Sequence, residues 1–103
     1  MFKHQGDITF IKISDREIES EKHDGSFIVG FGEATGHHHR VTVQKPQDME
    51  IVKVGDGFLL RVKTEALVTH EEHKPITLEP GTYRVGHERE MDWFSLSTRN
   101  VID

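Results

Sequence analysis

Turn-forming residues interrupt the apolar segments of this chain so often that little room is left for a long helix. Residues 8–13, 26–33 and 49–54 have the alternation and the β-branched or aromatic content that are typical of strands. The sequence Gly55-Asp56-Gly57 favours a tight β-hairpin. The polar stretch 14–25 has too few apolar positions for a packed helix, so we expect a loop there. The core must therefore be built from strands.

We predict an all-β protein, a small single-domain barrel or sandwich of about seven or eight short antiparallel strands. The strands are expected at 8–13, 26–33, 37–43, 49–54, 58–62, 65–69, 76–78 and 82–88. The chain has 103 residues, which fits one domain over residues 1–103 with one core. Because glycine-rich strands leave sheet edges to be covered, we also expect a homodimer.

Composition excludes several classes of protein and of site. The chain has no cysteine, so disulfides, thiolate metal ligands and cysteine nucleophiles are excluded, and a cytoplasmic location is expected. The formal net charge of −5 argues against nucleic-acid binding, which draws its affinity from cationic contacts with phosphate. The apolar runs are too short to span a membrane, and no signal peptide is expected. We therefore expect neither a nucleic-acid partner nor a membrane partner.

Three consecutive histidines, His37 to His39, begin one of the predicted strands. Side chains of an extended segment alternate between its two faces. His37 and His39 should therefore share the core-facing side with Val41 and Val43, whereas His38 should face solvent. Two imidazoles placed two residues apart on one face can bind the same metal ion.

A second histidine segment, His70-Glu71-Glu72-His73, lies about thirty residues further on. If the sheet closes, this segment lies beside the inward face of the first, and the histidines of the two segments converge. Four imidazoles, or three with one glutamate carboxylate, form a site that suits Zn, Ni, Cu or Fe better than Ca or Mg. We therefore expect a divalent transition metal (Zn, Ni or Fe) or, as the alternative, a small anionic ligand to bind through His37, His39, His70 and His73.

Other interpretations of the histidines remain open. In a non-catalytic, oligomeric protein-interaction module they would be structural residues that hydrogen-bond to the backbone. In a metal-dependent hydrolase or oxygenase, Glu71 or Glu72 would act as the base. The sequence has neither a nucleophile elbow nor a phosphate-binding glycine loop, so we expect a non-enzymatic domain. His87 is a further candidate ligand at a strand end, and Trp93-Phe94 is expected to dock the C-terminal residues on the body.

Several groups of residues resemble a family of small uncharacterised proteins of bacteria and their viruses. The matching pieces are His4-Gln5-Gly6-Asp7, Gly32 to Val41 with Gly36-His37-x-His39-Arg40, Thr69 to Ile76 with His70-Glu71-Glu72-His73-Lys74-Pro75, and Pro80-Gly81-x-Tyr83-Arg84-Val85. The resemblance implies a domain of viral or mobile-element type with no assigned activity. It also implies that His37 and His39 matter more than His38. Where the family tends to have glutamine and tyrosine, this chain has Glu88 and Met91.

Overall fold

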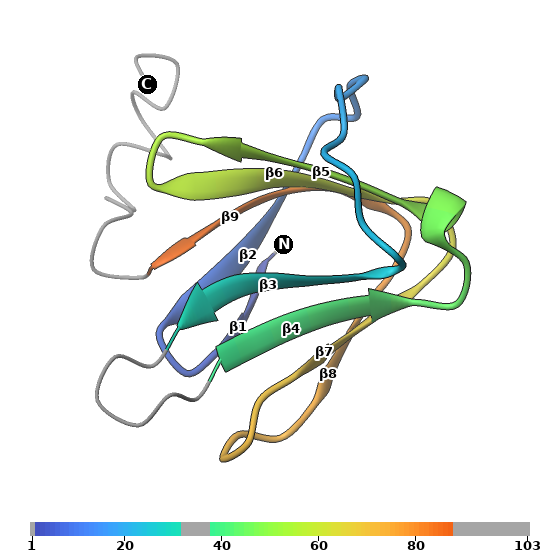
Figure 1. The fold of residues 1–103 in the computed structure, drawn as a ribbon. Coiled ribbons are helices and arrows are strands. Elements are labelled where there is room, and N and C mark those ends of the chain that lie inside the picture. Colours follow the sequence, from blue (N-terminus) through green and yellow to red (C-terminus); the bar gives the residue numbers. More distant parts are fainter. Residues whose placement is uncertain (1, 32–37, 88–103) are drawn as a thin grey trace.

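The computed structural model describes residues 2–31 and 38–87, which form nine strands and one short 3-10 helix (Figure 1). The strands are β1 (Phe2–Gln5), β2 (Ile8–Ile13), β3 (Ser26–Phe31), β4 (His38–Val43), β5 (Met49–Val54), β6 (Gly57–Val62), β7 (Ala66–Thr69), β8 (Ile76–Leu78) and β9 (Gly81–His87). The 3-10 helix, Pro46–Asp48, forms the turn between β4 and β5. In this described part of the chain, no helix is long and apolar enough to cross a membrane.

The strands form two antiparallel sheets that pack face to face as a sandwich (Figure 1). One sheet has the order β1-β2-β9-β6-β5 and the other has the order β3-β4-β7-β8. The prediction of an all-β barrel or sandwich is confirmed, and the sandwich is the form observed. The predicted strand count is too low because β1 has no alternating apolar pattern. Its four residues become a strand by pairing with β2 in a hairpin.

One apolar core lies between the two sheets. The five-stranded sheet contributes Ile8, Phe10, Met49, Ile51, Leu60, Val62, Tyr83 and Val85, and the four-stranded sheet contributes Val29, Val41, Val43, Ala66, Val68 and Leu78. Phe27 and Phe58 link the sheets through an edge-to-face contact, with ring centroids 5.6 Å apart. The hydroxyl of buried Tyr83 donates to the carbonyl oxygen of Glu79 at 2.6 Å, so burying this ring leaves no unpaired polar group.

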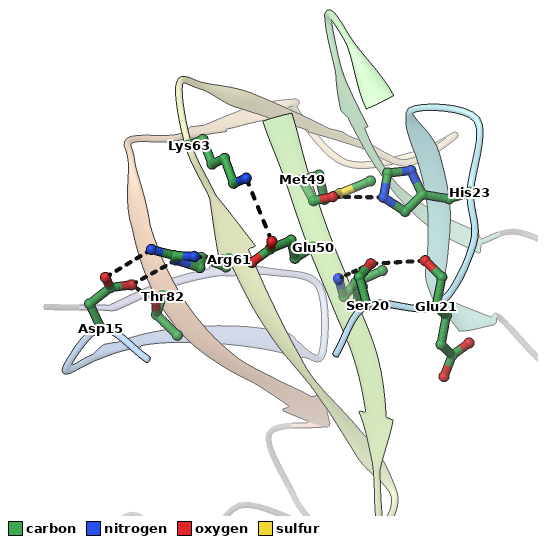
Figure 2. A network of polar contacts seen from close by, with 10 residues as sticks. Asp15, Ser20, Glu21, His23, Met49, Glu50, Arg61, Lys63 and Thr82 are labelled. Atoms are coloured by element: carbon green, nitrogen blue, oxygen red, sulfur yellow. Dashed lines mark hydrogen bonds and ion pairs between the residues drawn. The ribbon is translucent and has the colours of Figure 1, made fainter. Parts of the chain in front are cut away.

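The loop between β2 and β3 runs along the outer edge of β5 (Figure 2). The backbone N–H of Glu21 donates to the carbonyl oxygen of Ile51 at 2.7 Å, and the N–H of Ile51 donates to the Ser20 hydroxyl at 3.0 Å. The His23 Nε2 atom bonds to the carbonyl oxygen of Met49 at 2.7 Å. These contacts occupy backbone groups that an edge strand would otherwise offer to another chain.

A charged network anchors the start of the same loop on the outer face of the five-stranded sheet (Figure 2). The Asp15 carboxylate accepts hydrogen bonds from the Thr82 hydroxyl at 2.5 Å and from Arg61 Nε at 3.0 Å. Arg61 also donates to Glu50 at 3.2 Å. The hydrogen bond from Thr82, followed by that from Arg61, holds the pKa of Asp15 below its usual range. Each charge of this network therefore has a partner of opposite sign.

A bulge in β3 lets the strand approach the inner side of the sandwich closely. The pairing of β3 with β4 shifts register between Ile28 and Gly30, as the glycines of this segment predict. A side chain at Gly30 would place its Cβ 2.6 Å from Ile8 Cδ1 and 3.4 Å from His39 Cδ2. Glycine at this position therefore leaves room for the His39 ring.

Candidate functional site

The strand β4 buries His39 and turns His38 to the other face, as the predicted alternation requires. His39 is 4% exposed and shares the inner face with Val41 and Val43. On the outer face, the backbone N–H of His38 donates to Glu71 Oε1 at 3.0 Å, and His38 Nδ1 lies 3.8 Å from Glu71 Oε2. Neighbouring histidines of the same strand thus lie in different surroundings.

The loop between β7 and β8 brings the second histidine segment to His39. The ring centroid of His39 lies 4.3 Å from that of His70 and 6.2 Å from that of His73, and the His70 and His73 centroids are 4.6 Å apart. His70 is half-buried and His73 is exposed. The expected meeting of the two segments is therefore observed for these residues, which we call the histidine cluster.

Gln5 at the end of β1 fixes the protonation of His39. The Gln5 amide nitrogen donates to the carbonyl oxygens of Val68 at 3.1 Å and Lys74 at 2.8 Å. With the amide nitrogen directed at two acceptors, the Gln5 Oε1 atom must accept, and its partner at 2.8 Å is His39 Nδ1. His39 Nδ1 therefore carries the proton, and the Nε2 atom of the neutral ring keeps a lone pair.

The surroundings of His39 favour the neutral ring. Burial, which penalises the charged imidazolium, and the nearby His70 lower the pKa of His39 to about 4. The Asp7 carboxylate opposes this shift, whereas His73 and His87 add to it more weakly. At neutral pH the ring is uncharged, which is the form in which imidazole binds a metal ion.

The turn between β1 and β2 brings a carboxylate to the histidine cluster. Asp7 Oδ1 lies 3.9 Å from His39 Nε2, and Asp7 Oδ2 lies 3.2 Å from His87 Nδ1. Gly6 has a φ of 60°, and a Cβ there would be 2.8 Å from His73 Nε2 and 3.3 Å from His39 Cε1. Glycine therefore satisfies both the turn conformation and the close approach of two imidazoles.

The donor atoms of the cluster do not converge on one point. Across 2–31 and 38–87, no group of three His, Asp or Glu side chains is arranged to hold a metal ion. The His70 Nδ1 atom accepts a hydrogen bond from the Glu72 N–H at 3.0 Å. His37, the fourth predicted ligand, lies outside the described residues, as does the Trp93-Phe94 pair.

Comparison with known proteins places the chain in a family. Residues 4–88 match the model of a family described as Domain of unknown function (DUF8820). The chain belongs to this family. The matched span covers the histidine cluster, the β1–β2 turn and Gln5. No curated protein and no solved structure matches the chain.

Gln5 and Asp7 are the candidate site residues that the sequence analysis did not identify. Both lie in the matching piece His4-Gln5-Gly6-Asp7, but neither has the spacing of a ligand motif. Gln5 bonds to residues 34 to 69 positions away, and such distant contacts leave no local pattern. The sequence feature that could have indicated Asp7 is the glycine before it, because this glycine marks a tight turn that exposes the next side chain.

Proposed function

We propose that this protein is a non-enzymatic β-sandwich domain that binds a divalent transition metal, Zn, Ni or Fe, at the histidine cluster. The observation that carries the proposal is the meeting of His39, His70 and His73 from two separate segments, with His39 Nε2 left as an acceptor. His37 remains a predicted fourth ligand.

The ligand chemistry supports this choice of metal. Imidazole is a borderline ligand that suits Zn, Ni and Fe, and the chain has no thiolate to compete for them. The hydrogen bond from His39 Nδ1 to Gln5 resembles the outer contacts that orient metal-binding histidines. The pKa of His39, lowered to about 4 chiefly by burial, means that binding at neutral pH displaces no proton from this ring.

Metal binding requires the exposed rings to turn. His73 and the adjacent Glu71 and Glu72 are exposed on the β7–β8 loop, where side chains can change rotamer at little cost. His39 is held by Gln5 and needs no movement, because its Nε2 atom already faces the β1–β2 turn. The proposal therefore assigns His39 as the fixed ligand and the loop histidines as ligands that close on the ion.

The test is thermal unfolding of protein prepared without a histidine tag, with and without zinc or nickel at about pH 7.5, where imidazoles are neutral. A ligand that binds only the folded state at 100 times its dissociation constant adds about 2.7 kcal/mol, which raises Tm by more than about 10 °C in a domain of this size. Elemental analysis of the same preparation identifies any metal that is retained.

Two variants test whether the metal binds at the histidine cluster or at any histidine of the chain. His73→Gln removes an exposed ring without disturbing the core and should abolish most of the Tm shift. His38→Gln, which changes the histidine beside His39 on the opposite face, should retain it. Equal shifts in both variants, or no shift in the parent, would overturn the proposal and leave the histidines with a structural role.

A further inference from the structure

We infer that Asp7 is a ligand of the same ion, so that the site consists of two imidazoles and one carboxylate from His39, His73 and Asp7. The inference rests on the proposed function. It assigns as a metal ligand a residue that lies in neither of the two histidine segments. It changes the expected donor set from imidazoles alone to mixed nitrogen and oxygen.

The distance between Asp7 and His39 fits a shared ion. Zinc binds nitrogen and carboxylate oxygen at about 2.0–2.2 Å, so two such ligands lie about 3.4 Å apart in tetrahedral geometry and at most about 4.3 Å apart. Asp7 Oδ1 and His39 Nε2 are 3.9 Å apart, and no hydrogen bond joins them. A shift of the exposed Asp7 side chain by about half an ångström would bring its oxygen to the tetrahedral separation.

The other oxygen of Asp7 has a different partner. Asp7 Oδ2 lies 3.2 Å from His87 Nδ1, whose residue pairs with Ile8 across the β2–β9 ladder. A hydrogen bond to one oxygen of a ligand carboxylate directs the other oxygen at the metal, as outer partners commonly do in metal sites. His87, a candidate ligand in the sequence analysis, therefore takes the role of a positioning residue for Asp7.

Gly6, in the β1–β2 turn, allows the His73 ring to lie against the same turn that presents Asp7. A Cβ at Gly6 would lie 2.8 Å from His73 Nε2, so this nitrogen rests directly against the backbone that precedes Asp7. The same Cβ would lie 3.3 Å from His39 Cε1, which is bonded to His39 Nε2. His73 and His39 thus both lie against Gly6, next to Asp7, and rotation of the exposed His73 and Asp7 side chains would bring their donor atoms to the ion that His39 Nε2 binds.

His70 is less suited to be the third ligand. Its Nδ1 atom accepts the Glu72 N–H at 3.0 Å, so the neutral ring carries its proton on Nε2. Its ring lies over His39 with centroids 4.3 Å apart and an interplanar angle of 37°. This stacking shields the His39 face from water, which favours ligand binding without requiring coordination by His70.

The test is calorimetric titration of the intact, tag-free chain with zinc, comparing Asp7→Asn with His70→Gln. Asp7→Asn keeps the size and turn preference of the residue and should weaken binding by more than the roughly 10- to 100-fold lost with an outer partner. His70→Gln, which tests the three-imidazole set of the proposed function, should weaken binding less than Asp7→Asn does. Nitrogen-15 NMR of the imidazoles should show zinc-induced shifts at Nε2 of His39 and His73.

The outcomes distinguish this inference from the proposed function. If the parent binds zinc and Asp7→Asn binds it equally well, the carboxylate is not a ligand, although the metal site stands. If His70→Gln loses binding while Asp7→Asn keeps it, the three-imidazole set is correct and this inference is overturned. If the parent binds no zinc, the proposed function itself fails. Circular dichroism of each variant confirms that loss of binding is not loss of fold.

Discussion

The two edges of the five-stranded sheet are attached to the rest of the molecule by different chemistry. At the β5 edge, backbone groups pair with the β2–β3 loop, and Asp15 at the start of this loop pairs with Arg61 on the outer face of the sheet (Figure 2). At the β1 edge, Lys3 Nζ donates to the carbonyl oxygen of Thr77 at 2.6 Å, and Gln5 connects Val68 to His39. Both edges join segments that are distant in sequence, so both contribute to the fold.

The two edges differ in whether their hydrogen-bonding groups all have partners once these contacts are made. The donors and acceptors at the β5 edge form closed pairs, as expected of a purely structural region. At the β1 edge, His39 uses Nδ1 to bond Gln5, and its Nε2 atom has no hydrogen-bond donor among the described residues. The second ring nitrogen of His39, which lies 3.9 Å from Asp7 Oδ1, is the feature on which the proposed metal site rests.

The largest effect is expected from Gln5→Leu, which removes the side chain that organises the β1 edge. Gln5 is 3% exposed, and its loss leaves the Val68 carbonyl, the Lys74 carbonyl and the His39 N–H without their partner. At about 1–3 kcal/mol for each unsatisfied buried group, the total cost is about 4 kcal/mol, and Tm should fall by more than about 15 °C.

The matched change at the other edge is Ser20→Ala. It removes one exposed acceptor from the Ile51 N–H, and water can replace it, so the expected cost is at most about 1 kcal/mol. Urea unfolding of both variants measures the difference. Losses of similar size at the two edges would contradict the view that Gln5 fixes His39 in a buried network.

The next effect concerns the pH dependence that His39 gives to the stability of the fold. Burial, with His70, lowers the pKa of His39 from 6.5 to about 4 in the folded state, so between these values the unfolded chain binds more protons than the folded chain. The stability that depends on neutral His39 is therefore complete above about pH 6.5 and is lost as the pH falls toward 4. Between about pH 7.5 and pH 5 the loss is about 2 kcal/mol.

Urea unfolding of metal-free protein at those two pH values tests this expectation. His39→Gln keeps a donor for Gln5 but cannot titrate, so it should lose about 2 kcal/mol less than the parent over the same interval. An unchanged slope in His39→Gln would show that the ring is not held neutral by its surroundings.

The alternation of β4 shows what a local pattern can predict. The valines at positions 41 and 43 identify the inner face, and the period of two then separates His39 from His38 without knowledge of the partner strands. The same kind of evidence predicted the hairpin at Gly55-Asp56-Gly57. These features depend on residues that are close together in the chain.

Gln5, Asp7 and β1 show what a local pattern cannot predict. The partners of Gln5 lie 34 to 69 residues away, and its role depends on which loop the fold brings to it. The strand β1 has the mixed sequence Phe-Lys-His-Gln, and its pairing with β2 determines its conformation. The approach of His70 and His73 to His39 was predicted from the sequence, whereas the carboxylate of Asp7, 3.9 Å from His39 Nε2, was identified from the structure.

The smallest effect is expected at the start of the β2–β3 loop, from Asp15→Asn. The hydrogen bonds from Thr82 and Arg61 hold the pKa of Asp15 below 3.8, so its contribution to stability is present above that value and is lost as the pH falls through the lower, folded-state pKa. The substitution should therefore lower Tm slightly at neutral pH. Because the carboxylate is exposed, the difference should shrink as salt is added.

Thermal unfolding at neutral pH, and at a pH well below 3.8, measures this contribution. In strong acid the Asp15 carboxyl of the parent is protonated as well, so the parent and Asp15→Asn should unfold together. Asp56→Asn, in the β5–β6 turn, is the control, because Asp56 has no hydrogen bond or ion pair in the described part of the chain and its replacement should leave Tm unchanged. A difference between the parent and Asp15→Asn that persists in strong acid would mean that the side chain acts through its shape and hydrogen bonds, and that the attachment of the β2–β3 loop to the sheet does not depend on its charge.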